Sequence, residues 1–492
     1  MYLERMLKGS LVYFIALVFA SGFAYLTRLT LLHNLSQAEF GLFYAALTFI
    51  SIFLMLRNLG MYHAFVKFIP EYVIKKQYGK IKSAFFFIFI SQTLFSVIFI
   101  SVIWYLSPFL AEFYFKDPSS LWILRLLSLY FFTSILFKLT GAYFRGFQNN
   151  FVAALIEPVK NLIILLSIIS LSYFGFGIFS AVWSYVLVGI VMLFIFYYPA
   201  IKTHNLINDK MSDFRKVSSQ IIAFGIPVFS VGIGGKFISY FDTLMLTYFG
   251  TLEQVGVYNI ILPTALLFMI VVSSVSSVFM PMVSELWTRK KYDKVRTAMR
   301  LAYRYIFLFG LPFLLSFVIF SDVIIRLLFG EEYLFGNLAF KILLLGIIFN
   351  FLLEINKSYL VGIGRPKNVF NIVLFGAVMN IVLNLILIPS LNILGAAIAT
   401  SVSYLSMSVY SSNFVKDSLS MKLPIKSWMM AGVGSLVFLG VIYGTKAILN
   451  QNVWIEIFVG LSIGYIVYLF IMNSFGLLNI REIKHLIKST LK

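Results

Sequence analysis

The most constraining feature of this sequence is the way its basic residues alternate along the chain. Long apolar runs are separated by connections, and every second connection is basic: Lys75, Lys76, Lys80 and Lys82; Lys202, Lys210, Arg215 and Lys216; Arg289, Lys290, Lys291, Lys294, Arg296 and Arg300; Lys416, Lys422 and Lys426; Arg481, Lys484, Lys488 and Lys492. The intervening connections are short and carry Glu39, Glu112, Asp117, Glu253, Glu331 and Glu332. This pattern is typical of a polytopic helical membrane protein whose basic loops lie in the cytoplasm.

Composition agrees with a membrane protein. Of the 492 residues, 61% are hydrophobic and 12% are charged, which is too few charges for the surface of a soluble domain. The net charge of +20 would favour nucleic acid in a soluble chain. Here the excess lies in loops that flank the membrane, where it fits attraction to anionic lipid, so we expect no nucleic-acid partner. The chain has no cysteine, which excludes disulfides and thiolate chemistry.

A helix that crosses a bilayer needs about 20 apolar residues. Fourteen stretches qualify: 11–32, 40–66, 83–108, 121–144, 152–173, 178–197, 221–249, 256–283, 303–320, 339–362, 369–388, 395–414, 428–447 and 453–472. An even number places both termini on the same side, which the basic loops identify as the cytoplasm. Residues 480–491 form a short basic amphipathic stretch that we expect on the inner surface. We therefore predict an all-α protein with 14 transmembrane helices.

The sequence also repeats itself weakly at an offset of about 215 to 219 residues. Four features recur in order: Glu39-Phe-Gly41 and Gln254-Val-Gly256, Gly146 to Asn149 and Gly364 to Asn368, Asn161 and Asn380, and Ser184-Tyr185 and Ser403-Tyr404. They predict two pseudo-symmetric six-helix lobes in the same orientation, 1–210 and 211–421, followed by residues 422–492 with helices 13 and 14 and the tail. Parallel repeats of this kind are a transporter architecture, with the substrate site between the halves.

Charged residues inside the spans are the candidates for function, because a charge at mid-bilayer costs about 2.5 to 3.5 kcal/mol on insertion scales. The basic ones are Arg28, Arg57, Arg125, Lys138, Lys160, Lys236, Lys341 and Lys357, and the acidic ones are Glu157, Asp242 and Glu354. Bases outnumber acids, so a cavity lined by these side chains would favour an anion. Arginine can bind phosphate oxygens bidentately, whereas lysine supplies a point charge.

These candidates differ in strength. Arg57, Lys138 and Lys236 have no acidic residue one helical turn away in the sequence and are the strongest substrate-binding candidates, with Lys357, Arg28 and Lys160 after them. Arg28, Arg125 and Lys341 lie near outer span ends, where long side chains can reach water. Glu157 with Lys160, and Glu354 with Lys357, are spaced for ion pairs on one helix face. Asp242, Glu354 and Glu157 are candidates for ion coupling, and Asn58 and Asn356 for cavity hydrogen bonds, although contacts between helices explain such asparagines equally well.

Several segments resemble a known family. They are Asn34 to Gly41 after a span that bears Arg28, Gly225-Ile-Pro227 opening the seventh span, Asp242 near the outer end of that span, and Pro389 followed by Gly395 to Tyr404. The sequence resembles the polysaccharide-biosynthesis flippases, the oligosaccharidyl-lipid branch of the multidrug/oligosaccharidyl-lipid/polysaccharide (MOP) exporter superfamily. The resemblance covers essentially the whole chain. It implies a two-lobed, V-shaped, MATE-like bundle that moves lipid-linked sugars across the cytoplasmic membrane by alternating access.

The resemblance and the cationic spans favour a flippase for a polyprenyl-(pyro)phosphate-linked oligosaccharide, used in cell-surface polysaccharide or glycoprotein assembly. The alternatives are a multidrug or organic-cation antiporter of the same superfamily and a flippase for a lipid II-type peptidoglycan precursor. A membrane glycosyltransferase or polymerase would need a sizeable polar loop, and the longest outer connection is short, so we expect no enzyme. The four histidines are scattered, so we expect no metal or other cofactor. Expected partners are the lipid-linked substrate, membrane lipid and a possible coupling ion, Na⁺ or H⁺, and we expect a monomer.

Overall fold

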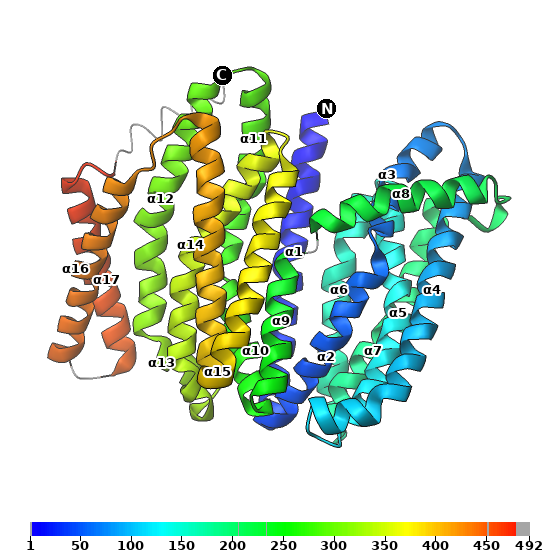
Figure 1. Cartoon of the computed structure of the whole chain (residues 1–492), viewed down its shortest axis with the longest axis horizontal. Coiled ribbons are helices and arrows are strands. Elements are labelled where there is room, and N and C mark those ends of the chain that lie inside the picture. Colours follow the sequence, from blue (N-terminus) through cyan, green and yellow to red (C-terminus); the bar gives the residue numbers. More distant parts are fainter. Residues whose placement is uncertain (1, 205, 233, 450–451, 479–492) are drawn as a thin grey trace. The chain divides into compact units, whose positions relative to one another are not determined.

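The structure is a computed structural model that describes residues 2–204, 206–232, 234–449 and 452–478, with the side chains of 2–11, 207 and 230–237 outside the description. The described residues are helical almost throughout (Figure 1). The chain divides into two compact units, unit 1 from Met1 to Ile260 and unit 2 from Ile261 to Lys492. The tail predicted to be amphipathic lies outside the described residues.

Unit 1 contains the helices α1 to α9 and most of α10. They are α1 (Tyr2–Asn34), α2 (Gln37–Asn58), α3 (Met61–Ile74), α4 (Tyr78–Phe109), the π-helical turn η1 (Leu110–Tyr114), α5 (Ser120–Gly146), α6 (Asn150–Tyr173), α7 (Ile178–Thr203), η2 (Leu206–Asn208), α8 (Phe214–Gly232), α9 (Gly234–Phe249) and most of α10 (Leu252–Leu266). Close packing joins α1 to α6, α5 to α7, and α4 to α5.

Unit 2 is built around the buried helix α14. Its elements are α11 (Met269–Thr288), α12 (Tyr292–Ile319), α13 (Ser321–Leu328), η3 (Glu331–Gly336), α14 (Asn337–Gly362), α15 (Pro366–Leu419), α16 (Ile425–Leu449) and α17 (Val453–Ser474). Helix α14 contacts α11, α12 and α15. A separate apolar cluster joins α16 and α17 to α12, and there the Tyr468 hydroxyl donates a hydrogen bond to the Leu308 carbonyl at 2.7 Å.

The prediction of an all-α polytopic membrane protein is confirmed. Twelve stretches of described helix are long and apolar enough to cross a membrane. One of them, α15, contains two predicted spans joined at Asn392, whose backbone is not helical (φ 49°, ψ −127°). The predicted span 221–249 is shared between α8 and α9, neither of which is counted alone. The described helices are therefore consistent with fourteen spans, while the lobe boundaries at 210 and 421 stay predictions.

The second predicted span is broken between α2 and α3. Leu59 and Gly60 both adopt positive φ, 42° and 73°, which ends one helix and starts the next. At this break the backbone of α8 comes very close: a Cβ on Gly60 would lie 2.0 Å from the carbonyl oxygen of Gly225, and a Cβ on Gly225 would lie 2.7 Å from that of Leu59. Only glycine fits at both positions.

The linker between α7 and α8, residues 204–213, is attached to the first turns of α4. The Ser83 hydroxyl donates a hydrogen bond to the Ser212 carbonyl at 2.7 Å and accepts one from the Ser212 amide at 3.1 Å. The Lys82 ammonium donates to the Asp209 carbonyl at 2.7 Å, and the ammonium of Lys80 lies 3.2 Å from the Asp213 carboxylate. These contacts fix the start of α8 against α4.

Candidate functional site

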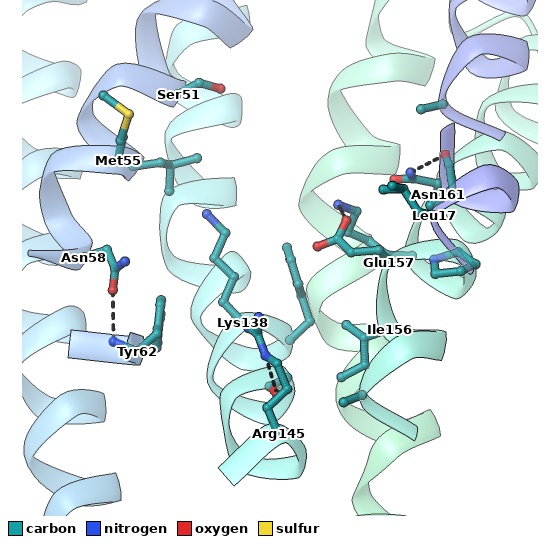
Figure 2. A pocket seen from close by; sticks show the side chains of 18 of the residues that line it. Leu17, Ser51, Met55, Asn58, Tyr62, Lys138, Arg145, Ile156, Glu157 and Asn161 are labelled. Carbon is teal, nitrogen blue, oxygen red and sulfur yellow. Dashed lines mark hydrogen bonds and ion pairs between the residues drawn. The ribbon is translucent and has the colours of Figure 1, made fainter. Parts of the chain in front are cut away.

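Unit 1 encloses a cavity of about 940 Å³, which we call the unit 1 cavity. Residues from α1, α2, α3, α5, α6, α7, α8 and α9 line it. Figure 2 shows part of this lining, with Met55 and Asn58 on one side and Glu157 and Asn161 on the other. The wall of this cavity contains polar and charged side chains, although the protein as a whole is predominantly apolar. Charged residues inside membrane helices are by default candidates for a functional site.

Helix α5 presents one face to the cavity. Its lining positions are Tyr130, Phe137, Lys138, Gly141 and Arg145. At 3.6 residues per turn these positions fall within about 100° of the helix circumference, so they form a single stripe. The Lys138 side chain extends from α5 into the cavity, and Arg145 lies two helical turns further along (Figure 2). The Arg145 Nε donates to the carbonyl of Gly141 at 3.2 Å, which leaves the outer nitrogens of its guanidinium for other acceptors.

Helix α6 supplies an ion pair to the opposite wall. The Lys160 ammonium contacts the Glu157 carboxylate one turn away, as the spacing predicted, with side-chain exposures of 15% and 61%. Asn161 lines the same wall and donates to the Ala20 carbonyl on α1 at 2.8 Å. Asn58 lines the α2 side, where its Oδ1 accepts from the Tyr62 amide at 3.2 Å. Both asparagines therefore combine a structural bond with a position on the cavity.

The described lining carries a surplus of positive charge. Lys138, Arg145 and Lys160 face a single carboxylate, Glu157. In the low dielectric of a membrane protein this surplus favours an anionic ligand over a cation. Among the described residues no group of three or more His, Cys, Asp or Glu side chains could hold a metal ion.

Arg57, a leading candidate from the sequence, does not line this cavity. Its side chain is 1% exposed and is held between α4 and α5. The guanidinium donates to the Phe131 carbonyl and, at 3.1 Å each, to the hydroxyls of Ser96 and Ser134, and it lies 4.6 Å from the Phe131 ring centroid. These contacts are those of a cation that joins helices.

Arg28 and Asp242 also lie in unit 1 but outside the lining. Arg28 donates to the Asn259 carbonyl and lies 4.6 Å from the ring centroid of Tyr44. Asp242 is fully buried and accepts a hydrogen bond from the Tyr258 hydroxyl at 2.7 Å. The backbone of Lys236 is part of α9, but its side chain lies outside the described residues.

The remaining candidates belong to unit 2. Lys357 and Glu354 form the predicted ion pair at 2.7 Å. Asn356 is fully buried: its Oδ1 accepts from the Tyr303 hydroxyl at 2.5 Å, and its amide donates to the hydroxyls of Ser411 and Ser412 at 2.8 and 3.1 Å. This arrangement satisfies the side chain through contacts between helices. The structure therefore brings together Lys138, Lys160, Glu157 and Asn58 in unit 1, whereas Asn356, Glu354 and Lys357 belong to unit 2.

Sequence reasoning missed Arg145, His63 and the tyrosines of the cavity, chiefly Tyr130, Tyr185 and Tyr240. Arg145 could have been predicted from the sequence as a cavity residue, because it lies seven residues after Lys138 and so on the same helix face. The tyrosines could not have been predicted as cavity residues. Aromatic residues are abundant throughout this chain, and residue type alone does not separate lipid-facing from cavity-facing positions.

The fold and the cationic cavity together define a polytopic helical membrane protein of the transporter class. The sequence profile of the polysaccharide biosynthesis protein family matches residues 6–287, and the MatE profile matches residues 227–386. The first match covers more than half of the chain, so the chain belongs to the polysaccharide biosynthesis protein family. The resemblance to the MOP superfamily noted in the sequence is thereby confirmed.

Several known proteins are similar to this chain. The chain is 29% identical to an uncharacterized membrane protein of Methanocaldococcus jannaschii, covering all of this chain and 99% of that protein. It is 27% identical, over 48% of this chain and 50% of the relative, to a probable low-salt glycan biosynthesis flippase of Haloferax volcanii. Among solved structures, the lipid II flippase MurJ in an inward closed conformation has a TM-score of 0.78 at 18% identity, covering 94% of this chain and 98% of that chain. An inward-facing MATE multidrug transporter has a TM-score of 0.70 at 14% identity, covering 83% of this chain and 98% of that chain. At these identities the structures establish the fold.

Proposed function

We propose that this protein is a flippase that moves a polyprenyl-(pyro)phosphate-linked oligosaccharide across the cytoplasmic membrane by alternating access, with both termini in the cytoplasm and without catalysing a reaction. The observation that carries the proposal is the positive surplus of the unit 1 cavity, in a chain that belongs to the polysaccharide biosynthesis protein family. The glycan flippase relative supports the same substrate class.

The chemistry of such a substrate fits the cavity. Its phosphate groups need cationic partners, which Lys138 and Lys160 supply as point charges and Arg145 supplies as a planar fork. Its glycan needs hydrogen-bonding groups and room for water, and a cavity of about 940 Å³ with Asn58 and several tyrosines in its wall offers both. Its lipid tail can remain in the bilayer. An ion gradient of Na⁺ or H⁺ is the driving force to test.

An organic-cation antiporter is the competing function with the same fold. Such a transporter needs carboxylates in its cavity that are free to bind a cation. The carboxylate of Glu157 is already held by Lys160, and Lys138 and Arg145 oppose a cationic ligand. A lipid II-type precursor also carries phosphate, so the choice between the two anionic lipids depends on the glycan.

Export in cells tests the proposal. Depletion of the protein should cause one lipid-linked oligosaccharide to accumulate on the cytoplasmic face of the membrane. The double variant Lys138→Ala, Lys160→Ala should fail to restore export, while Lys291→Ala, which removes an exposed lysine of the α11–α12 connection, should restore it fully. Accumulation of no glycolipid on depletion, combined with sensitivity to organic cations, would replace the flippase with the antiporter.

A further inference from the structure

The unit 1 cavity differs chemically along its length. Counting along α5, Tyr130 precedes Lys138 by eight residues, or about 12 Å of helix, and Lys138 precedes Arg145 by seven, or about 10 Å. We call the end near Arg145 the inner end, because it adjoins connections predicted to be cytoplasmic, and the end near Tyr130 the outer end. Lys138 and Arg145 lie on the inner side of Tyr130 along α5, and Glu157 and Lys160 lie within about three turns of the start of α6, which follows the inner end of α5.

The outer end is closed by packed side chains. The lining of α1 stops at Ala24 and that of α2 begins at Leu47. About one turn beyond these residues, Arg28 of α1 lies over the ring of Tyr44 of α2 and donates a hydrogen bond to the Asn259 carbonyl. A ligand that fills the cavity must therefore end against this closure.

Among the described residues, the lining at the outer end is uncharged and includes three tyrosines, Tyr130, Tyr185 and Tyr240. Tyr185 of α7 and Tyr240 of α9 are partly exposed there. Tyr130 packs edge-on against Tyr185, with ring centroids 5.5 Å apart and an interplanar angle of 82°. Ser51 of α2 lines the same end. Tyr130 thus fixes the position of the Tyr185 ring, which faces the cavity.

Such a surface suits a sugar better than a phosphate. A phosphate needs cations, and the described lining offers them only toward the inner end. A pyranose presents a face of C–H bonds and a rim of hydroxyls. A tyrosine side chain is likewise an apolar ring with one polar tip, and can contact both.

We propose that Tyr185 and Tyr240 form a subsite for the sugar attached directly to the lipid phosphate, with Tyr130 as a positioning residue for Tyr185. The inference rests on the proposed flippase function and adds an orientation to it: the first sugar occupies the outer end, and the phosphates lie among Lys138, Lys160 and Arg145. The substrate therefore enters with its glycan first.

Binding to the purified full-length protein in nanodiscs tests this subsite. The ligands are a polyprenyl diphosphate without sugar and the same lipid carrying one glucose or one N-acetylglucosamine. The parental protein should bind at least one glycosylated lipid more tightly than the bare lipid. Tyr185→Ala and Tyr240→Ala should each weaken the binding of the glycosylated lipid by about tenfold and leave the binding of the bare lipid unchanged. The Phe variants, which keep the aromatic face, should lose less affinity.

Two controls separate this inference from the function on which it rests. Lys138→Ala should weaken the binding of both lipids equally. Tyr105→Ala, which removes an 85% exposed tyrosine of α4 outside the cavity lining, should weaken the binding of neither lipid. A parental protein that gains no affinity from either sugar, or tyrosine variants that weaken both lipids alike, would overturn the sugar subsite while the flippase function stands. A parental protein that binds none of these lipids would overturn the function and the subsite together.

Discussion

Arg57 donates a hydrogen bond to the carbonyl oxygen of Phe131 and also lies over the ring of that residue. A cation held twice by one neighbour, and further bonded to two serines, is a structural joint between helices. Hydrogen bonds to a charged group contribute about 1.5 to 3 kcal/mol each. Arg57 makes three, which outweighs the roughly 2.5 to 3.5 kcal/mol that an intramembrane charge costs.

We therefore expect Arg57→Ala to destabilise the protein by on the order of 2 kcal/mol, through lost hydrogen bonds and a void. The measurement is the melting temperature of the purified protein in detergent. Lys341→Ala, which removes a partly exposed cation from α14, is the control and should melt at the parental temperature. If Arg57→Ala melts normally and yet abolishes export, Arg57 belongs to the substrate site after all.

Arg145 should contribute more than charge. Its planar fork can hold two phosphate oxygens at once, so Arg145→Lys should restore glycan export only partly, and Arg145→Ala should reduce it by about tenfold or more. Transport of a fluorescent lipid-linked sugar in proteoliposomes measures the effect. Full activity of Arg145→Lys would show that a point charge suffices at this position.

The two ion pairs of matched spacing should behave differently. Glu157→Gln removes the only carboxylate among the described lining residues and leaves Lys160 with its full charge, so binding of a bare polyprenyl diphosphate should tighten by a few fold. Glu354→Gln alters the equivalent pair with Lys357 in unit 2 and should leave that affinity unchanged. Equal effects of the two variants would argue that neither pair reports on the unit 1 cavity.

The close approach of Gly60 and Gly225 should control access to the cavity. Gly225→Ala places a methyl group 2.7 Å from the Leu59 carbonyl oxygen and must push α8 away from the α2–α3 break. We expect faster maleimide labelling of an Asn58→Cys reporter, because Asn58 lines the cavity beside this contact. Gly22→Ala is the control, since a Cβ there meets nothing within 4 Å. Unchanged labelling in Gly225→Ala would mean that the contact does not limit access.

The alternating loops predict the sidedness of the chain. Because the sequence contains no cysteine, single substitutions give clean reporters. In intact cells an impermeant thiol reagent should label Glu331→Cys and leave Lys291→Cys unlabelled until the membrane is opened. Labelling of Lys291→Cys from outside would reverse the topology.

The fold could be predicted from the sequence because the bilayer imposes simple rules of length and charge. Breaks within spans were beyond those rules. The α2–α3 break depends on Leu59 in a left-handed conformation, which leucine rarely adopts and which its identity does not announce. The non-helical backbone at Asn392, by contrast, falls between the spans predicted at 369–388 and 395–414, so hydropathy located that boundary.

The candidate site could be predicted only in part, for a geometric reason. Burial depth along a helix follows from sequence position, but the direction of a side chain does not. Arg57 and Asn58 are neighbours on α2, and the rotation of about 100° between them turns Asn58 to the cavity and Arg57 to the serines of α4 and α5. Lys138 and Lys160 were found because they carry charge, whereas the tyrosines carry no such signal.

The attachment of the α7–α8 linker to α4 gives α8 a pivot. Ser212 is held to Ser83 at both its amide and its carbonyl, so the start of α8 cannot move independently of α4. From Ser212 to Gly225 the chain rises about 20 Å, and a tilt of about 10° around this pivot would carry Gly225 through about 3 Å. That displacement is enough to separate it from the Gly60 backbone. A small rotation of α8 about Ser212 would thus separate the backbones of Gly60 and Gly225.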